Sequence, residues 1–210
     1  MSTQYVVTTG AVAAGATTLA NVISDHWSTT TLLEGQIEVD NPFFTDAQQN
    51  PERWMFHSQL HFLAASARRH EELRRLLSGS ESAIVLEDRT PFEHHGVYSQ
   101  AAVKAGYLQP REMGLLTEVA QTYEQGYLNP DLLIYREMST EQLLSRVTSR
   151  GRAGETVDFD RLQTILETFE EFISAWDRSD VVRVPADVDL LSPDGQDQLI
   201  AQLEGRLPRL

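Results

Sequence analysis

The 210-residue sequence contains no cysteine, which excludes disulfide bonds and metal sites built on thiolates. Basic residues are scarce as well: 17 lysines and arginines stand against 31 aspartates and glutamates, so the net charge is −14. A protein that binds nucleic acid or an anionic membrane surface needs many cations to neutralise phosphates. We therefore expect neither of these partners, although a local basic pocket stays compatible with the total charge.

Long apolar runs are also missing. No run approaches the roughly 18 residues that a membrane span requires, and the N-terminus leads into a β-rich run without the charged region of a signal peptide. We therefore expect a cytoplasmic protein. Hydrophobic residues make up 41% of the chain, enough for a sizeable core. The length fits one domain that spans residues 1–210.

Short apolar or β-branched runs alternate with longer helical patterns along the whole chain. Continuous apolar runs are typical of strands buried on both faces. Strands that alternate with helices predict an α/β fold with a parallel sheet covered by helices on both faces. The five expected strands begin at Tyr5, Thr30, Ala83, Leu132 and Val181.

The helical patterns are placed by apolar spacing and by residues that favour helix ends. Pro51 suits a first helical turn, and Ser139 suits an N-cap. Gly35 and Asn41-Pro42 break the pattern, so we expect a loop over residues 34–50. The expected helices cover residues 17–27, 51–77, 91–105, 110–125, 140–149 and 159–176, with a weaker one at the C-terminus.

The first expected strand runs directly into Gly10-Ala-Val-Ala-Ala-Gly15-Ala16-Thr17, followed by Thr18. This is the spacing of a phosphate-binding loop, in which backbone N–H groups at a helix N-terminus hold phosphate oxygens. Thr17 is then the candidate Mg²⁺ ligand. Ala16 stands where such loops have the lysine that neutralises the transferred phosphate. The alternative is a small-residue turn that binds nothing.

Asp88-Arg89-Thr90 follows the apolar run that starts at Ala83. Charged residues at the carboxyl end of a parallel strand lie where open α/β sheets bind ligands. This position favours a functional role for Asp88 and Arg89. A surface turn with an ordinary ion pair is the alternative.

Three arginines cluster in this acidic chain: Arg146, Arg150 and Arg152. Arg146 and Arg150 are four residues apart and share a helix face, where like charges repel each other. An anion between them would remove the repulsion, which fits a lid of about residues 146–158 that closes over phosphates. A solvated basic face is the alternative.

The order of these segments resembles the deoxynucleoside kinase family, especially the bacterial deoxyadenosine, deoxyguanosine and deoxycytidine kinases. The resemblance covers nearly the whole chain, and it depends on the order and spacing of the motifs rather than on any single one. The matching segments are the loop 10–17, Asn41-Pro-Phe-Phe44, Asn50 to Phe56, Gln59, Asp88-Arg-Thr90, Pro130 to Tyr135, Arg146 to Arg152, and Glu155.

The resemblance implies a P-loop kinase fold, ATP and Mg²⁺ as cofactors, and roles for individual residues. Asp88 would join Thr17 at Mg²⁺, and Arg89 would lie beside the 5′-hydroxyl and the phosphate. Arg146, Arg150 and Arg152 would form the lid that holds ATP. The residues expected at the nucleoside are Gln59, Phe56 and Tyr98 at the base, His94 at the base-sensing position, and Gln48 and Glu155 at the sugar.

Several of these positions depart from the family pattern. The general-base glutamate falls on Gln36, whose amide cannot accept the hydroxyl proton, so Glu34 or Glu38 is the expected substitute. The sugar-binding tyrosine falls on Gln48 and the base-sensing acid on His94. The departures affect phosphoryl transfer and nucleoside recognition, while the motifs of the fold and the lid arginines remain.

Two functions follow as hypotheses. The first is ATP-dependent phosphorylation of the 5′-hydroxyl of a deoxynucleoside or an unusual nucleoside, with the arginines supplying the missing positive charge. The alternative is a catalytically impaired subunit that binds nucleotide or only keeps the fold. Nucleoside and nucleoside triphosphate are the expected ligands. The resemblance also implies a homodimer, with a heterodimer with a paralogue as the other possibility.

Overall fold

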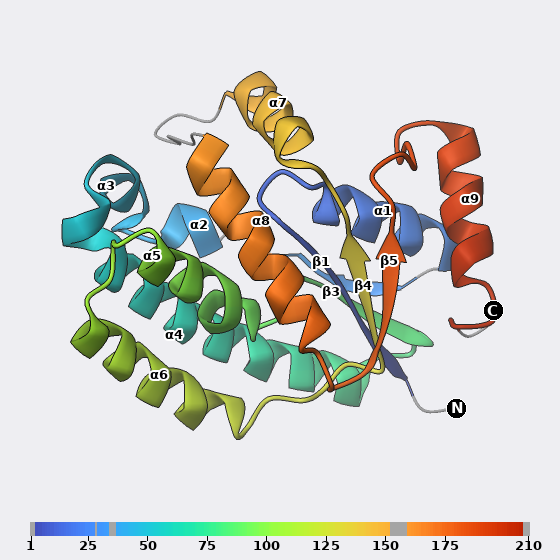
Figure 1. Cartoon of the computed structure of the whole chain (residues 1–210). Coiled ribbons are helices and arrows are strands. Elements are labelled where there is room, and N and C mark those ends of the chain that lie inside the picture. Colours follow the sequence, from blue (N-terminus) through green and yellow to red (C-terminus); the bar gives the residue numbers. More distant parts are fainter. Residues whose placement is uncertain (1–2, 28, 34–36, 152–158, 208–210) are drawn as a thin grey trace.

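Five parallel strands form one sheet in the order β2-β3-β1-β4-β5 (Figure 1). The structure is a computed structural model, and it describes residues 3–27, 29–33, 37–151 and 159–207. All five expected strands are present, so the prediction of a parallel α/β sheet is confirmed. Their bounds are β1 Gln4–Gly10, β2 Thr30–Leu32, β3 Ile84–Asp88, β4 Leu132–Arg136 and β5 Asp180–Val184.

Helices cover both faces of this sheet because successive strand residues point to opposite sides. Val6 packs in the cluster under α1 (Ala16–Trp27) and α9 (Pro193–Leu203). Its neighbours Tyr5 and Val7 pack in the cluster on the other face. The helices that contribute to this second cluster include α4 (Pro51–Gly79), α7 (Thr140–Arg150) and α8 (Phe159–Ser174).

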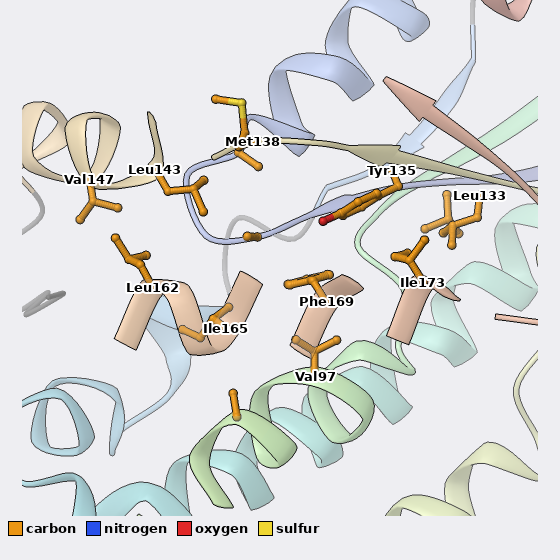
Figure 2. Close-up of a cluster of buried hydrophobic side chains, with 14 of the residues drawn as sticks. Val97, Leu133, Tyr135, Met138, Leu143, Val147, Leu162, Ile165, Phe169 and Ile173 are labelled. Atoms are coloured by element: carbon orange, nitrogen blue, oxygen red, sulfur yellow. The ribbon is translucent and has the colours of Figure 1, made fainter. Parts of the chain in front are cut away.

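Helix α8 contributes one apolar stripe to this second cluster. Leu162, Ile165, Phe169 and Ile173 recur at helical spacing and are buried (Figure 2). The ring of Phe169 stacks on that of Tyr135 from β4, with 6.1 Å between the centroids. Helices α7 and α8 are thus fixed to the sheet on the side where residues 146–151 of the lid begin.

Two segments differ from the expectation. Residues 37–49 are not a loop: they form the short helices α2 (Ile37–Asp40) and α3 (Phe44–Gln49) on either side of Asn41-Pro42. Helices of this length carry no periodic pattern that a sequence could show. The buried Asn41 fixes the segment, because its amide donates to the Ser58 hydroxyl at 3.0 Å and its oxygen accepts from the Phe43 N–H.

The expected helix over residues 91–105 forms in two parts, the π-helix η1 (His94–Ser99) and α5 (Gln100–Lys104). Gly96 allows η1 to approach α8, because a Cβ there would lie 2.7 Å from the Phe172 ring. Helix α6 (Pro110–Glu124) follows as expected, and Ser139 caps α7 as expected. No helix among the described residues is both long and apolar enough to cross a membrane.

The strand order determines where a ligand can bind. Strand β1 lies between β3 and β4, and the chain proceeds to β2 and β3 on one side and to β4 and β5 on the other. Open parallel sheets bind ligands at such a switch point, beyond the carboxyl ends of the strands. The end of β1 is Gly10, the first residue of the expected phosphate loop, and the end of β3 is Asp88.

Candidate phosphotransfer site

The loop after β1 turns through two residues with a left-handed backbone before α1 begins. Gly15 has φ 93 and Ala13 has φ 64, so both residues adopt the left-handed conformation. This conformation suits glycine, but for alanine it costs about 1–2 kcal/mol. Ala13 thus adopts the left-handed conformation despite its side chain, and α1 begins shortly after it at Ala16.

Arg146 reaches this loop from α7. Its Nη1 donates to the carbonyl of Ala14 at 3.1 Å and lies 3.5 Å from that of Ala13. Helix α7 is a firm support for this side chain, because its N-terminus has a reciprocal capping box and Leu143 and Val147 are buried. A cation from α7 thus lies against a loop that lacks its own lysine.

Thr17 and Asp88 lie together, as expected. The Thr17 hydroxyl donates to Asp88 Oδ2 at 2.6 Å, and Asp88 is 2% exposed. The other carboxylate oxygen, Oδ1, is buried and has no hydrogen-bond partner among the described residues. A buried carboxylate oxygen without a donor, beside a hydroxyl, fits a hard cation such as Mg²⁺.

These two residues alone do not make a complete metal site. In the part of the chain that the structure describes, no group of three or more His, Asp or Glu side chains could hold a metal ion. Mg²⁺ commonly takes only one or two protein ligands and completes its shell with water and substrate phosphates. The arrangement therefore fits a metal that arrives with a nucleotide.

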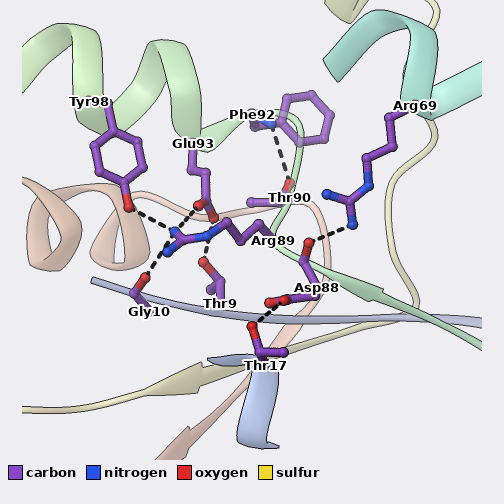
Figure 3. Close-up of polar contacts among 10 residues, drawn as sticks. All are labelled: Thr9, Gly10, Thr17, Arg69, Asp88, Arg89, Thr90, Phe92, Glu93 and Tyr98. Carbon is purple, nitrogen blue, oxygen red and sulfur yellow. Dashed lines mark hydrogen bonds and ion pairs between the residues drawn. The ribbon is translucent and has the colours of Figure 1, made fainter. Parts of the chain in front are cut away.

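Arg89 is held in a strained and heavily hydrogen-bonded position at the end of β3. Its backbone has φ 73, which is unusual for a residue other than glycine. Its Nη1 donates to Glu93 Oε1 and to the Tyr98 hydroxyl, both at 2.7 Å, and lies 3.3 Å from the carbonyl of Gly10 (Figure 3). The guanidinium is thus oriented between β1 and η1.

Glu93 is the anion that orients Arg89, and the Thr9 hydroxyl donates to its second oxygen. The side chain is fully buried. Burial raises the pKa of the Glu93 carboxyl, while the neighbouring Arg89 lowers it. Sequence reasoning missed this residue, although its four-residue spacing from Arg89 was a usable signal.

A cavity of about 700 Å³ connects these groups. The cavity is large enough for the triphosphate of a nucleotide, and its lining includes residues of the loop and three arginines. Glu38, from α2 and one of the two carboxylates expected as the base, lies on its wall. Its lining residues include Gly15, Ala16, Thr17, Thr18, Glu38, Asn41, Phe44, Arg89, Arg146 and Arg150.

Two of the residues expected at the base lie beside a second, smaller cavity of about 40 Å³. Gln59 and Tyr98 line it together with Arg161 from α8. The amide oxygen of Gln59 accepts from the Ser99 hydroxyl at 3.2 Å. Phe56 belongs to a third cluster of apolar side chains under α4 and α6.

His94, the first residue of η1, is buried against α4. Its ring stacks on Phe62 with 4.9 Å between the centroids and 10° between the planes. Burial, together with the nearby Arg89 and Arg69, lowers the pKa of the His94 imidazole to about 3, so the ring is neutral near pH 7. The resemblance predicts a base-sensing acid at this position, and the chain has a neutral imidazole there. Gln48 lies half-buried on α3.

Four of the expected site residues lie outside the described residues: Glu34, Gln36, Arg152 and Glu155. The described residues expected at the phosphates, the metal and the base-catalysis position come from the ends of β1 and β3 and from α1, α2 and α7. Those expected at the nucleoside come from α3, α4 and η1. Sequence reasoning also missed the buried pair Arg69 and Glu87, which lies directly behind Asp88. No sequence signal marks them, because the arginine belongs to a polar helical pattern and the glutamate to an apolar strand.

Comparison with known proteins gives one consistent family. The deoxynucleoside kinase family matches residues 6–206. Among curated proteins, the deoxyadenosine/deoxycytidine kinase of Bacillus subtilis is 28% identical over 190 residues, which is 88% of this chain and 84% of that protein. The deoxyguanosine kinase of Lactobacillus johnsonii is 22% identical over 217 residues, covering 98% of this chain and 93% of that protein.

Solved structures agree on the fold. The deoxyadenosine kinase of M. mycoides with bound dATP superposes with a TM-score of 0.81 and 21% identity, covering 96% of this chain and all of that one. The same enzyme with products dCMP and dCDP bound gives a TM-score of 0.80 and 20% identity, over 95% of this chain and 98% of that chain. At this identity the likeness shows the fold, and it confirms the expected P-loop kinase architecture.

Proposed function

We propose, from the premise that this chain belongs to the deoxynucleoside kinase family, that it transfers the terminal phosphate of a nucleoside triphosphate to the 5′-hydroxyl of a deoxynucleoside. Family membership makes it a phosphotransferase. The observation that carries the proposal is the 700 Å³ cavity in which the loop, Arg89, Arg146 and Arg150 meet. This arrangement would surround a polyphosphate with hydrogen-bond donors and positive charge.

The phosphates of ATP would lie on the backbone N–H groups of residues 10–17, with Thr18 at the start of α1. Arg146 and Arg150, with Arg152 from the lid, would supply the charge that Ala16 lacks. Bidentate guanidinium contacts suit phosphate oxygens well. Mg²⁺ held by Thr17 and Asp88 would neutralise charge on the phosphates.

In the transfer step, the 5′-oxygen bonds to the γ-phosphorus while the bond from that phosphorus to the bridging oxygen of ATP breaks. The hydroxyl proton passes to a carboxylate, for which Glu38 is the described candidate on the cavity wall and Glu34 the alternative. Gln36 cannot accept it. Arg89, fixed by Glu93 and Tyr98, would stabilise the charge on the transferred group.

The nucleoside would extend from Arg89 towards Gln59 and Tyr98, with Phe56 and His94 nearby and with Gln48 and Glu155 on the side of the sugar. The base would point towards the small cavity beside Gln59. Because a histidine occupies the base-sensing position, no carboxylate is present there to bind the base. The His94 ring is also neutral near pH 7, so it offers the base no charge. Base preference in this chain is therefore expected to differ from that of relatives that have the acid.

The direct test is phosphate transfer from ATP with Mg²⁺ to a panel of deoxynucleosides and ribonucleosides, with the monophosphate product identified by chromatography. We expect a 5′-monophosphate from at least one deoxynucleoside. The Arg146→Ala/Arg150→Ala variant should lose ATP binding in calorimetry, while Ala16→Lys should tighten it. Binding of ATP without turnover on any nucleoside would favour the catalytically impaired subunit instead.

Assembly forms a separate part of the proposal. Helix α4 and the helical segment after Thr90, which forms η1 and α5, would form a homodimer interface, and a heterodimer with a paralogue is the alternative. Val103 on α5, and Leu115 and Tyr123 on α6, are large apolar side chains that stay exposed in the single chain. Light scattering at micromolar concentration should give the mass of two chains, and a monomer would contradict the dimer.

A further inference from the structure

Arg69 joins the ends of two strands from a helix outside the sheet. Its Nη2 donates to the carbonyls of Leu32 and Asp88, each at 2.6 Å. Leu32 is the last residue of β2 and Asp88 the last residue of β3. Figure 3 shows the Arg69 side chain reaching Asp88 from α4. These two contacts are called the Arg69 bridge below.

Glu87 holds the guanidinium in this place. Its Oε1 lies 3.4 Å from Arg69 Nε, and its Oε2 accepts a hydrogen bond from the Tyr5 hydroxyl. The Glu87 side chain is 2% exposed and that of Arg69 10%. A planar guanidinium that is paired and buried in this way loses little conformational freedom when it donates to two carbonyls at once.

Strand β2 needs such support more than any other strand. It lies at the edge of the sheet, it pairs only with β3, and its register covers three residue pairs. The chain that leaves it leads to α2, which places Glu38 on the wall of the phosphate cavity. Asp88, at the other end of the bridge, accepts from Thr17. The bridge therefore links the segment with the expected base to the residue expected at the metal.

We propose that Arg69 is a positioning residue for phosphoryl transfer, which holds the carboxyl ends of β2 and β3 in the spacing that transfer requires. This inference rests on the proposed function. Arg69 is absent from the lining of the phosphate cavity. Its loss should therefore change kcat while leaving the affinity for ATP unchanged.

The competing explanation is an ordinary buried ion pair that only stabilises the fold. The two explanations differ in the variant Arg69→Met/Glu87→Gln, which removes both charges while keeping side chains of similar size. Removing both partners of a buried pair commonly costs little stability, whereas removing one leaves a buried charge without compensation. An ion pair with a structural role alone should thus be replaceable, but the carbonyls of Leu32 and Asp88 would still lack their donor.

The kinetic experiment compares wild type, Arg69→Met, Arg69→Met/Glu87→Gln and Glu87→Gln, with Arg68→Met as the matched control. Arg68 is the exposed neighbour of Arg69 on the same helix. Both Arg69 variants should lose on the order of 10²-fold in kcat, the size of loss that a displacement of about 1 Å can cause. Glu87→Gln, which keeps the bridging donors, should lose only a few-fold, and Kd for ATP should stay within about twofold throughout.

Hydrogen exchange at the amides of Thr30–Leu32 supplies a readout that is independent of activity. Both Arg69 variants should exchange faster there than wild type, and Arg68→Met should not. A double variant with kcat within a few-fold of wild type, or with unchanged exchange in β2, would overturn the inference. A wild-type protein that binds ATP but phosphorylates no nucleoside would overturn the proposed function, whatever the exchange result.

Discussion

The two halves of the candidate site differ in what holds them together. The loop 10–17 offers mainly backbone groups, and alanine stands at the position where such loops have a lysine, Ala16. The segment at and after the end of β3, residues 87–93, carries charged side chains that are largely buried and paired: Glu87 with Tyr5 and Arg69, Asp88 with Thr17, and Arg89 with Glu93. Phosphate binding by a loop depends on its N–H groups, so it tolerates side-chain changes that the end of β3 cannot.

The comparison also explains why positive charge can move. Arg146 contacts the loop from α7, and α7 is anchored by its own cap and core contacts. The cation can therefore come from another element as long as the backbone turn persists, which it does at Ala13. Asp88 has no such substitute, because no other carboxylate among the described residues accepts a hydrogen bond from Thr17.

The largest effect on activity is expected from a change in the charged half of the site, residues 87–93. Asp88→Asn keeps the size of the side chain but removes the anion that Mg²⁺ needs, so kcat should fall on the order of 10³-fold. Steady-state phosphate transfer measures it, with the exposed Asp25→Asn on α1 as the control. An Asp88→Asn variant as active as the control would show that the end of β3 takes no part in the chemistry.

The charged half should also make stability depend on pH. Burial raises the pKa of Glu87 to about 7 from 4.5, while Arg69 and the Tyr5 hydrogen bond oppose the rise. The native state therefore binds this proton more tightly than the unfolded state. Its contribution is fully present below about pH 4.5 and is lost as the pH rises through 7.

The corresponding experiment measures the free energy of unfolding of wild type and Glu87→Gln by denaturant titration between pH 4.5 and 8. Relative to the variant, wild type should lose about 3 kcal/mol across this range, at 1.36 kcal/mol for each pKa unit. The loop 10–17 contains no titratable side chain and contributes nothing to this difference. Parallel pH curves for the two proteins would contradict the assignment to Glu87.

The smallest expected effect is in the loop. Ala13→Gly relieves the left-handed backbone of Ala13 but gives the unfolded chain more freedom, so the net gain should be about 0.5–1 kcal/mol in the free energy of unfolding. Ala67→Gly, inside α4, should lower the same quantity by a similar amount. Equal destabilisation by both changes would mean that position 13 is not strained.

Much of the fold could be predicted from the sequence because its strands are buried on both faces. The runs at Ala83 and Leu132 are continuous apolar segments, and no solvated helix shows such a pattern. Residues 37–49 could not be predicted, since two short helices around Asn41 depend on its contact with Ser58 in α4. Only the folded chain brings these residues together.

The candidate site was predictable where spacing alone carries the signal. Each predicted group lies at a sequence position set by one strand or helix. The loop 10–17 follows β1, Asp88-Arg89 ends β3, and Arg146 lies on α7. The Arg69–Glu87 pair had no such relation, because a helix and a strand that are far apart in the sequence supply one charge each. Likewise, the neutral state of His94 follows from burial, which no local pattern reveals.

Helix α7 is expected to supply the positive charge that the loop 10–17 lacks. The most direct measurement is kcat/KM for ATP in Arg146→Ala, Ala16→Lys and the variant with both changes. Arg146→Ala alone should lose on the order of 10²-fold, and adding Ala16→Lys should restore most of that loss. A double variant as inactive as Arg146→Ala would contradict the claim, because the loop would then not accept a cation in place of Arg146.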